Sequence, residues 1–471
     1  MLPILWLAAA PSVATEVDLV HHVAAAHAAV DQAEARDCAE VFASWAHHLD
    51  RLPRPARGLS RDASLAHDLF ALRQAVSVRL SVLHDARTLS DACVVAARDL
   101  DMAQRRLTDD VLESVRPQHR PDAWLTAGEG FDPSQLRSGD VLVSRGDQLS
   151  SAGIASIGAY DAHFSHNALV YVDDAGQAWT VEAYLEKGAL VQPLEDFLAH
   201  GVRRVAVMRY HDADAAERAA ASAFERVAHG PTIPYDESLD ADDPTRLFCS
   251  QVAGWAFARS GGPVDIPLQR TPLDHDRRGP MFAGMGVTVP AFTAPADILF
   301  DPRFELVAEW RDVEALETLR RQEAVVQGVL GWMDHEGYGL TPRFRQKATV
   351  DVGLALRRTP GLGQLVADRL HPEGERGFLV TSLTLQQAGT VLFEQLEAER
   401  GDRRSTRDEL DALVVELRAA DRELWAANPR KATMHRLFAP ADVGGVPVWL
   451  AEAGTTRVGL GGGGRPGPLD P

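Results

Sequence analysis

The stretch FSHNALVYVDDAG, residues 164–176, decides the fold around it. Residues 167–172 are short and rich in strand-forming side chains, so they predict a β-strand with His166 at its start. The polar residues 173–176 that follow are typical of a tight turn. Strand character resumes over residues 177–184, which contain the run WTVEAY. The sequence therefore predicts an antiparallel β-hairpin.

Glu182, in the second strand of this hairpin, is expected near His166. A hairpin centred on the bond between residues 174 and 175 places residues 181–183 opposite residues 166–168. Glu182 then lies beside His166 to within one residue of register, and a slip of one residue changes the face to which it points. Glu186 and Asp196 are nearby acids and remain alternatives.

Cys249 lies far downstream, in the run LFCSQVAGWAFARSG of residues 247–261. A polar loop precedes it, and apolar residues at helical spacing follow it until two glycines end the pattern. A cysteine in the first turn of a helix faces unpaired N–H groups and the positive end of the helix dipole, which lower the pKa of its thiol. The same N–H groups can stabilise an oxyanion. Cysteine, histidine and an acid are the nucleophile, base and orienting group of thiol hydrolases.

The segment from about residue 132 to residue 312 resembles the permuted papain-like amidases, the YaeF/YiiX-type branch of the NlpC cysteine peptidase superfamily. Five runs carry the resemblance, in this order: LRSGDVLVSRG (136–146), FSHNALVY (164–171), WTVEAY (179–184), IPYDESLDADD (233–243) and FCSQVAGWAF (248–257). In ordinary papain-like enzymes the cysteine helix precedes the histidine strand. Here the order is reversed, as in the permuted branch.

The resemblance implies a role for each candidate site residue. Cys249 would be the nucleophile, His166 the base and Glu182 the group that orients the base. Tyr235 matches the tyrosine that precedes the cysteine motif; it would help to polarise the substrate carbonyl, with simple packing as the alternative. The family usually has Cys-Ser-Glu at the nucleophile, whereas residues 249–251 here read Cys-Ser-Gln, a change that leaves the triad intact. No cofactor is expected.

Three other groups of polar residues favour plainer interpretations. Ser165 and His166 are adjacent in a strand and point to opposite faces, so they do not form a nucleophile and base. Asp161, His163 and His166 resemble metal ligands, but they lack a further ligand pair, and no metal site is expected. The run Asp-His-Asp at residues 274–276 is interpreted as a solvated loop.

Three functions remain open at this point. The first is a cysteine amidase or peptidase that acts on small amide substrates, such as cell-wall peptides. The second is a lipid-directed acyl hydrolase or acyltransferase on the same fold, because a related papain-like branch works on lipids. The third is a non-catalytic binding module. An apolar cleft would favour acyl chains, and Arg and Asp groups at its rim would favour peptides.

The resemblance implies an α+β fold, with a papain-like catalytic domain built on an antiparallel sheet. Outside the segment that carries the resemblance, the periodicity predicts helical regions on both sides of that domain. Apolar residues at three- and four-residue steps, from Leu65 to Leu83, give the clearest helical stripe. The expected parts are a signal peptide (1–14), a helical bundle (15–118), the catalytic domain (119–312), a C-terminal helical region (313–455) and a disordered Gly/Pro tail (456–471).

The composition excludes some partners. The net charge of −19 argues against nucleic acid and against an anionic membrane surface. No run is long enough to predict a transmembrane helix. With Cys249 as a free thiol, Cys38 and Cys93 form either a disulfide or two buried thiols. A disulfide would fit an oxidising compartment, and the apolar N-terminus followed by small residues also favours export, with an apolar helical turn in a cytoplasmic protein as the alternative.

Overall fold

The structure is a computed structural model that describes residues 16–55, 60, 63–116, 124–128, 130–160, 163–185, 187–359, 376–401 and 405–440. The expected signal peptide (1–14) and the expected tail (456–471) lie outside these residues. So do Asp161, of the possible metal ligands, and Glu186, of the alternative acids.

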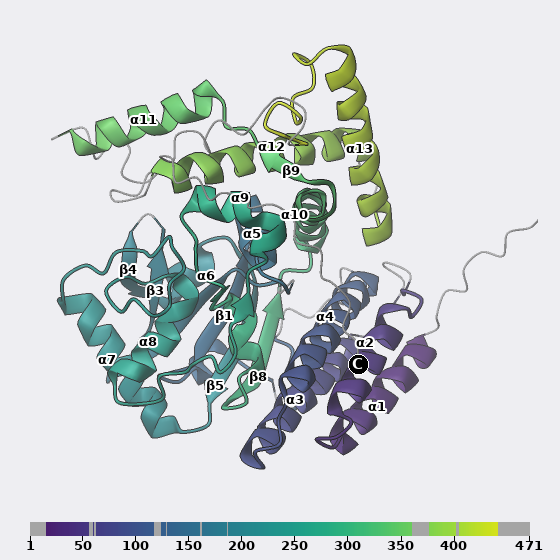
Figure 1. Ribbon diagram of the computed structural model, residues 1–471. Helices are drawn as coiled ribbons and strands as arrows, with labels where there is room; N and C mark the ends of the chain where they lie inside the picture. Colours follow the sequence, from purple (N-terminus) through teal and green to yellow (C-terminus); the bar gives the residue numbers. More distant parts are fainter. Residues whose placement is uncertain are drawn as a thin grey trace, which may run out of the picture.

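Four helices form a bundle at the N-terminal side, drawn in purple in Figure 1: α1 (Glu16–Gln32), α2 (Cys38–Asp50), α3 (Ser64–Asp85) and α4 (Asp91–Ser114). The apolar stripe on α3 is buried, from Leu65 to Leu83. Cys38 at the start of α2 and Cys93 at the start of α4 form a disulfide, with their Cα atoms 5.5 Å apart. Of the two states that the sequence allowed for these cysteines, the structure has the disulfide.

A six-stranded antiparallel sheet forms the centre of the molecule, in the order β4-β3-β2-β1-β5-β8. Its strands are β1 (Val141–Gly146), β2 (His166–Val172), β3 (Ala178–Tyr184), β4 (Gly188–Pro193), β5 (Val202–Tyr210) and β8 (Phe304–Arg311). Because side chains alternate along each strand, the two faces of the sheet carry different sets of residues.

The two faces of the sheet are covered by different helices. One face, with Leu169 and Val181, packs against α7 (Ala213–His229) and α8 (Val252–Arg259) in the largest apolar cluster. The other face, with Ala168 and Val170, packs against Phe197 of the short helix α6 (Leu194–Ala199). The 3-10 turn η3 (Cys249–Gln251) leads directly into α8.

The C-terminal helices lie across one end of the sheet domain, at the top of Figure 1, and β9 pairs there with β10. They are α10 (Leu316–Glu336), α11 (Phe344–Arg358), α12 (Arg376–Arg400) and α13 (Arg407–Ala427), with β9 (Tyr338–Leu340) and β10 (Phe438–Pro440). The remaining elements are η2 (Pro133–Gln135), α5 (Leu149–Ser156), β6 (Thr271–Pro272), α9 (His275–Met285), β7 (Ala291–Phe292) and η4 (Pro295–Phe300). Among the described residues, no helix combines the length and apolar character needed to cross a membrane.

The predicted fold class is confirmed: helical regions flank a mixed α+β domain built on an antiparallel sheet. The interpretation of residues 274–276 as a solvated loop is wrong. His275 opens α9, and the side chain of Asp274 caps this helix by accepting a hydrogen bond from the N–H of Arg277, 3.1 Å away. Pro280 lies inside α9 and hid the helix in the sequence, since proline usually ends a helical pattern.

Candidate active site

The register of the β2–β3 hairpin differs by one residue from the register that the sequence predicted. Leu169 pairs with Val181 and Val172 with Ala178, so the hairpin is centred on Ala175. The N–H of Gly176 donates to the carbonyl oxygen of Asp173, 2.9 Å away, and Gly176 has a φ of 80°. A turn followed by a left-handed glycine adds one residue to the loop, which accounts for the shift.

This shift decides which face of the sheet Glu182 occupies. In the observed register Glu182 is level with Ala168, so its side chain is on the same face as that of His166. The hairpin as first expected would have placed the two side chains on opposite faces. In the structure His166 Nε2 lies 2.7 Å from Glu182 Oε2. The predicted proximity of these two residues is thus found, and the exact register was wrong by one residue.

Glu182 is fully buried and held at its second oxygen by two neighbours. Thr180 Oγ1 donates to Oε1 at 2.5 Å and Gln192 Nε2 donates to the same atom at 2.8 Å. Burial alone would raise the pKa of Glu182, but the hydrogen bonds from His166, Thr180 and Gln192 outweigh it and lower the pKa. The carboxylate is therefore charged and fixed in orientation.

Tyr184 lies next to His166, and sequence reasoning missed it. Its ring stacks on the imidazole, with ring centroids 4.9 Å apart and an interplanar angle of 19°. Burial raises the pKa of its phenol, and the charge of Glu182 raises it further, so the hydroxyl stays protonated. Residues 180, 182 and 184 alternate along β3, and this spacing was a signal that they share one face.

Cys249 is a buried free thiol and the first residue of η3, which leads into α8. Its Sγ lies 3.9 Å from the carbonyl oxygen of Ser165, the residue before His166. Burial acts to raise the pKa of the thiol, but the hydrogen bond and charge of His166 lower it. The main-chain N–H groups of Asn167 and Ser250 act in the same direction, and the net pKa is lowered.

The imidazole of His166 joins the thiol to the carboxylate. Burial acts to lower its pKa, but hydrogen bonds to Cys249 and Glu182 outweigh burial and raise the pKa to about 10. A thiol with a lowered pKa beside an imidazole with a raised pKa favours the thiolate–imidazolium pair.

The structure places the other candidates as follows. Tyr235 forms a bridge with Leu247, two residues before Cys249, and its half-buried ring packs between two apolar clusters. Asp196 lies on α6 and is exposed. His163 is buried, with Nδ1 3.0 Å from Arg204 Nη1 and 3.5 Å from Glu323 Oε1. The roles of these residues stay predictions.

Comparison with known proteins concerns the sheet domain. No curated protein matches this chain. A family model matches residues 135–308, a segment that runs from η2 into β8 and contains His166, Glu182, Tyr235 and Cys249. The description of that family is "Permuted papain-like amidase enzyme, YaeF/YiiX, C92 family", so the resemblance drawn from the sequence is confirmed for this segment.

Proposed function

We propose that the chain is a cysteine amidase or peptidase in which Cys249 is the nucleophile, His166 the base and Glu182 the orienting acid. One observation supports this assignment above all others. Cys249 Sγ lies 3.9 Å from the carbonyl oxygen of Ser165, the residue before His166, and His166 Nε2 lies 2.7 Å from Glu182 Oε2, so the three side chains meet at the start of β2. The family match supports a papain-like cysteine hydrolase, and the assignment of the three roles is our own.

In the first half of the reaction the thiolate of Cys249 attacks the substrate carbonyl carbon. A carbon–sulfur bond forms and the carbonyl electrons move to oxygen. Main-chain N–H groups at the start of η3 and α8 are suited to stabilise this oxyanion. When the carbonyl re-forms, the carbon–nitrogen bond breaks and protonated His166 gives its proton to the leaving amine.

The second half releases the acyl group. Neutral His166 takes a proton from water, the oxygen attacks the thioester, and the carbon–sulfur bond breaks to return the thiolate and a carboxylic acid. Glu182 does not react. It holds the imidazole ring and stabilises its positive charge, while Thr180 and Gln192 hold Glu182.

The substrate we propose is a small amide or peptide, for which cell-wall peptides are the leading example. A specific observation favours lipid acyl groups as the second candidate. Side chains from α11 and α12 form an apolar cluster, and Leu185 packs against it. Leu185 directly follows Tyr184, whose ring stacks on His166. Apolar surface so close to the candidate base would suit an acyl chain.

Export from the cytoplasm is part of the proposal. A disulfide between Cys38 and Cys93 persists in oxidising compartments and is rare in the cytoplasm of most organisms. The apolar residues 2–10 and the small residues that follow are typical of a signal peptide.

Labelling with iodoacetamide under non-reducing conditions tests the catalytic pair directly. The chain has 3 cysteines, and two of them form the disulfide, so alkylation reports Cys249. We expect fast labelling at pH 7, below the ordinary pKa of a thiol, and strongly reduced labelling in His166→Ala. His200→Ala, on an exposed histidine after α6, is the matched control and should label like the unaltered chain.

To test the role of Glu182, substrate turnover must be measured as well as thiol labelling. In Glu182→Gln, we expect labelling to persist in part and hydrolysis of amide substrates to fall, because the imidazolium loses its support. Full turnover of Glu182→Gln at every pH would show that another acid acts, with Asp196 and Glu186 next to test. Unchanged labelling in His166→Ala would leave a non-catalytic binding module as the better description.

A further inference from the structure

Basic residues gather at the end of the C-terminal helical region. Arg343 Nε donates to the carbonyl oxygen of Arg436 at 2.8 Å, and Arg436 Nη1 donates to that of Arg430 at 3.4 Å. These contacts join the start of α11 to the segment after α13. We call the following six residues the basic patch: Arg343, Arg345, Lys347, Arg430, Lys431 and Arg436.

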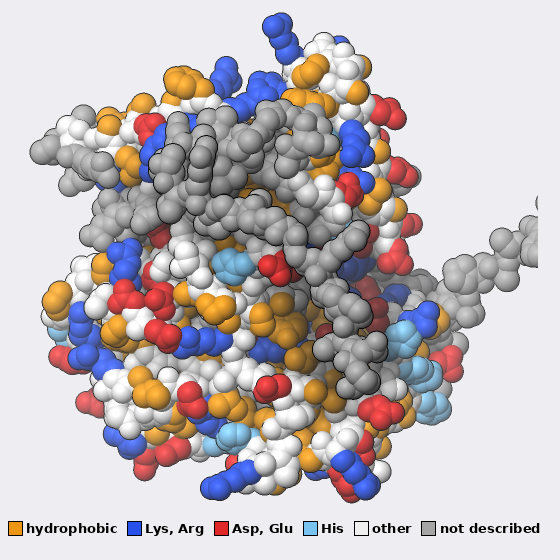
Figure 2. All heavy atoms as spheres, viewed as in Figure 1, with side chains coloured by type: hydrophobic (Ala, Val, Ile, Leu, Met, Phe, Trp, Pro, Cys, Tyr) orange, Lys and Arg blue, Asp and Glu red, His pale blue; other side chains and the backbone are white. Residues whose placement is uncertain are grey.

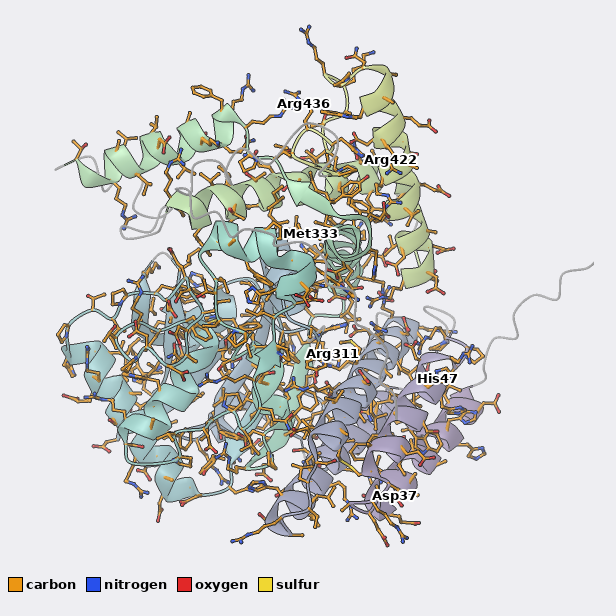
Figure 3. The ribbon with its side chains drawn as sticks, viewed as in Figure 1. Asp37, His47, Arg311, Met333, Arg422 and Arg436 are labelled. Carbon is orange, nitrogen blue, oxygen red and sulfur yellow. A yellow bond between two sulfur atoms is a disulfide. The ribbon has the colours of Figure 1, made fainter. Side chains whose placement is uncertain are left out.

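Figure 3 shows Arg436 between the start of α11 and the upper end of α13. In Figure 2 Lys and Arg side chains gather along the same upper edge of the molecule. All six residues of the patch are exposed or half-exposed.

The charges of the basic patch are poorly compensated. Among the described residues, none of its six members forms an ion pair with a carboxylate. Within residues 341–359 and 428–440 the only acidic residue is Asp351, which is paired with Arg376 at 2.6 Å and feels the charge of Lys347 more weakly. Partial burial and the neighbouring charge of Arg436 lower the pKa of Arg343. Like charges held side by side in this way would be stabilised by an anionic surface.

Exposed apolar side chains accompany these charges. Phe344, between Arg343 and Arg345, is 83% exposed, and Val352 two turns further along α11 is 59% exposed. Leu424, near the end of α13, is 43% exposed. The opposite face of α11 is already covered, because Val350 and Leu354 are buried against α12. An exposed phenylalanine flanked by arginines is typical of a helix that lies at a bilayer interface.

We propose that the basic patch and Phe344 dock the protein onto the surface of an anionic phospholipid bilayer. The net charge of −19 first argued against such a partner, but that figure sums the whole chain. Charges more than about 8 Å from the contact are screened at physiological salt, so the local positive charge decides the interaction. This inference rests on the surface alone and does not depend on the proposed catalysis.

Docking through α11 would bring the bilayer close to the candidate active site. The buried face of α11 belongs to the apolar cluster of α11 and α12, and Leu185 packs against the same cluster. Leu185 is one residue from Tyr184, which stacks on His166. Two layers of contacts therefore connect the proposed membrane-facing side of α11 to the candidate base.

Flotation with lipid vesicles tests the proposal. The full chain is mixed with vesicles of phosphatidylcholine alone or of an equimolar mixture with phosphatidylglycerol, at physiological salt. We expect binding to the anionic vesicles only, and release at about 1 M salt, where charges are screened within about 3 Å. Arg345→Glu/Lys431→Glu should weaken binding by roughly 30-fold or more, and Phe344→Ser by roughly tenfold.

Two matched variants control for nonspecific effects, because both alter the sheet domain. Arg218→Glu reverses an exposed charge on α7, and Val264→Ser removes an apolar side chain that is 80% exposed. Both should bind the anionic vesicles like the unaltered chain. Binding to both vesicle types alike, loss of binding in the controls, or no effect of the patch variants would overturn the proposal. Binding to soluble polyphosphate without binding to vesicles would also overturn it, and would point to an anionic polymer.

Discussion

Both helical regions make apolar contacts with the sheet domain, but buried ion pairs are concentrated at the N-terminal junction. The N-terminal bundle meets β8 through buried ion pairs: Arg73 of α3 contacts Glu309, and Asp109 of α4 contacts Arg311. Arg311 is labelled in Figure 3, where β8 approaches α4. By contrast, α10 and α12 meet α9 and the residues before Cys249 mainly through an apolar cluster that includes Phe248 and Phe282, with an ion pair between Arg278 of α9 and Asp334 of α10 at its side.

The difference predicts how each junction responds to change. A buried ion pair is weak evidence for net stability, but removal of one partner leaves an uncompensated buried charge. An apolar junction loses stability in proportion to the contacts and cavity that a substitution creates. We call the contact of the N-terminal bundle with β8 the ionic junction and that of α10 and α12 with α9 the apolar junction. A single substitution at the ionic junction is expected to lower the free energy of unfolding strongly, whereas a small one at the apolar junction should lower it little.

The largest effect is expected for Arg73→Met. This change removes one of the two arginine partners from each of the buried carboxylates Asp101 and Glu309. The buried cluster then lacks one positive charge, which should lower the free energy of unfolding by about 3–5 kcal/mol. Urea denaturation measures the change. Arg36→Met is the matched control, because Arg36 is 80% exposed and its pair with Glu34 should contribute no more than about 1 kcal/mol. Equal effects of the two variants would contradict the view of the ionic junction given above.

Loss of the disulfide comes next. Cys38 and Cys93 are 55 residues apart, and the chain-entropy relation gives about 4 kcal/mol for a loop of this length, near the upper end of the usual range of about 2–4 kcal/mol. Cys38→Ser/Cys93→Ser should lower the urea midpoint by a corresponding amount. A reducing agent should destabilise the unaltered chain and leave the double variant unchanged. If both respond alike, the disulfide does not stabilise the bundle.

The sequence predicted the hairpin and the cysteine helix because each depends on local patterns. Alternation and turn residues mark β2 and β3, and helical spacing after Cys249 marks α8. The register failed by one residue because the left-handed conformation of Gly176 lengthens the turn. Turn geometry of this kind is set by one residue, and several turn types were compatible with the same polar run.

The buried ion pairs could not be predicted, for a different reason. Arg73 and Glu309 are 236 residues apart, and neither belongs to a charge cluster that would mark it as buried. The same holds for Gln192, which reaches Glu182 only through the pairing of β4 with β3. Single polar residues acquire a partner from the tertiary fold, and charged side chains are on average exposed, so the pattern favoured solvent.

The apolar junction should tolerate an added methyl group with little loss of stability, and Gly389→Ala tests this. The added methyl group would lie 2.9 Å from Leu149 Cδ2, the end of a flexible side chain, so we expect a change below about 1 kcal/mol. Gly254→Ala, on α8, places the methyl group 2.1 Å from the carbonyl oxygen of Ile266 and should cost about 1–3 kcal/mol. Urea denaturation compares the two. A larger loss for Gly389→Ala would show that the junction is rigid.

The smallest effect is a change of stability with pH that separates two neighbouring carboxylates of α4: Asp109, which pairs with Arg311 of β8, and Asp110, which pairs with Arg54 and with Arg320 of α10. Burial raises the pKa of Asp110 to about 6, against the smaller opposing effects of Arg320 and Arg54. An acid with a raised folded pKa binds its proton more tightly in the folded state, so it adds stability as the pH falls from 7 through 6. Between pH 7 and pH 5 this gain is at most about 1 kcal/mol.

Asp109 acts in the opposite sense. Burial acts to raise its pKa, but Arg204 and Arg311 outweigh burial and lower it. Its contribution is fully present above the ordinary value of 3.8 and is lost as the pH falls below that value through the folded pKa. Stability should thus rise slightly from pH 7 to pH 5 and decline below pH 3.8. Asp110→Asn should remove the rise and keep the decline, so this variant shows whether Asp110 is the source of the rise. A rise that persists in Asp110→Asn would come from other groups and would contradict a raised pKa for Asp110.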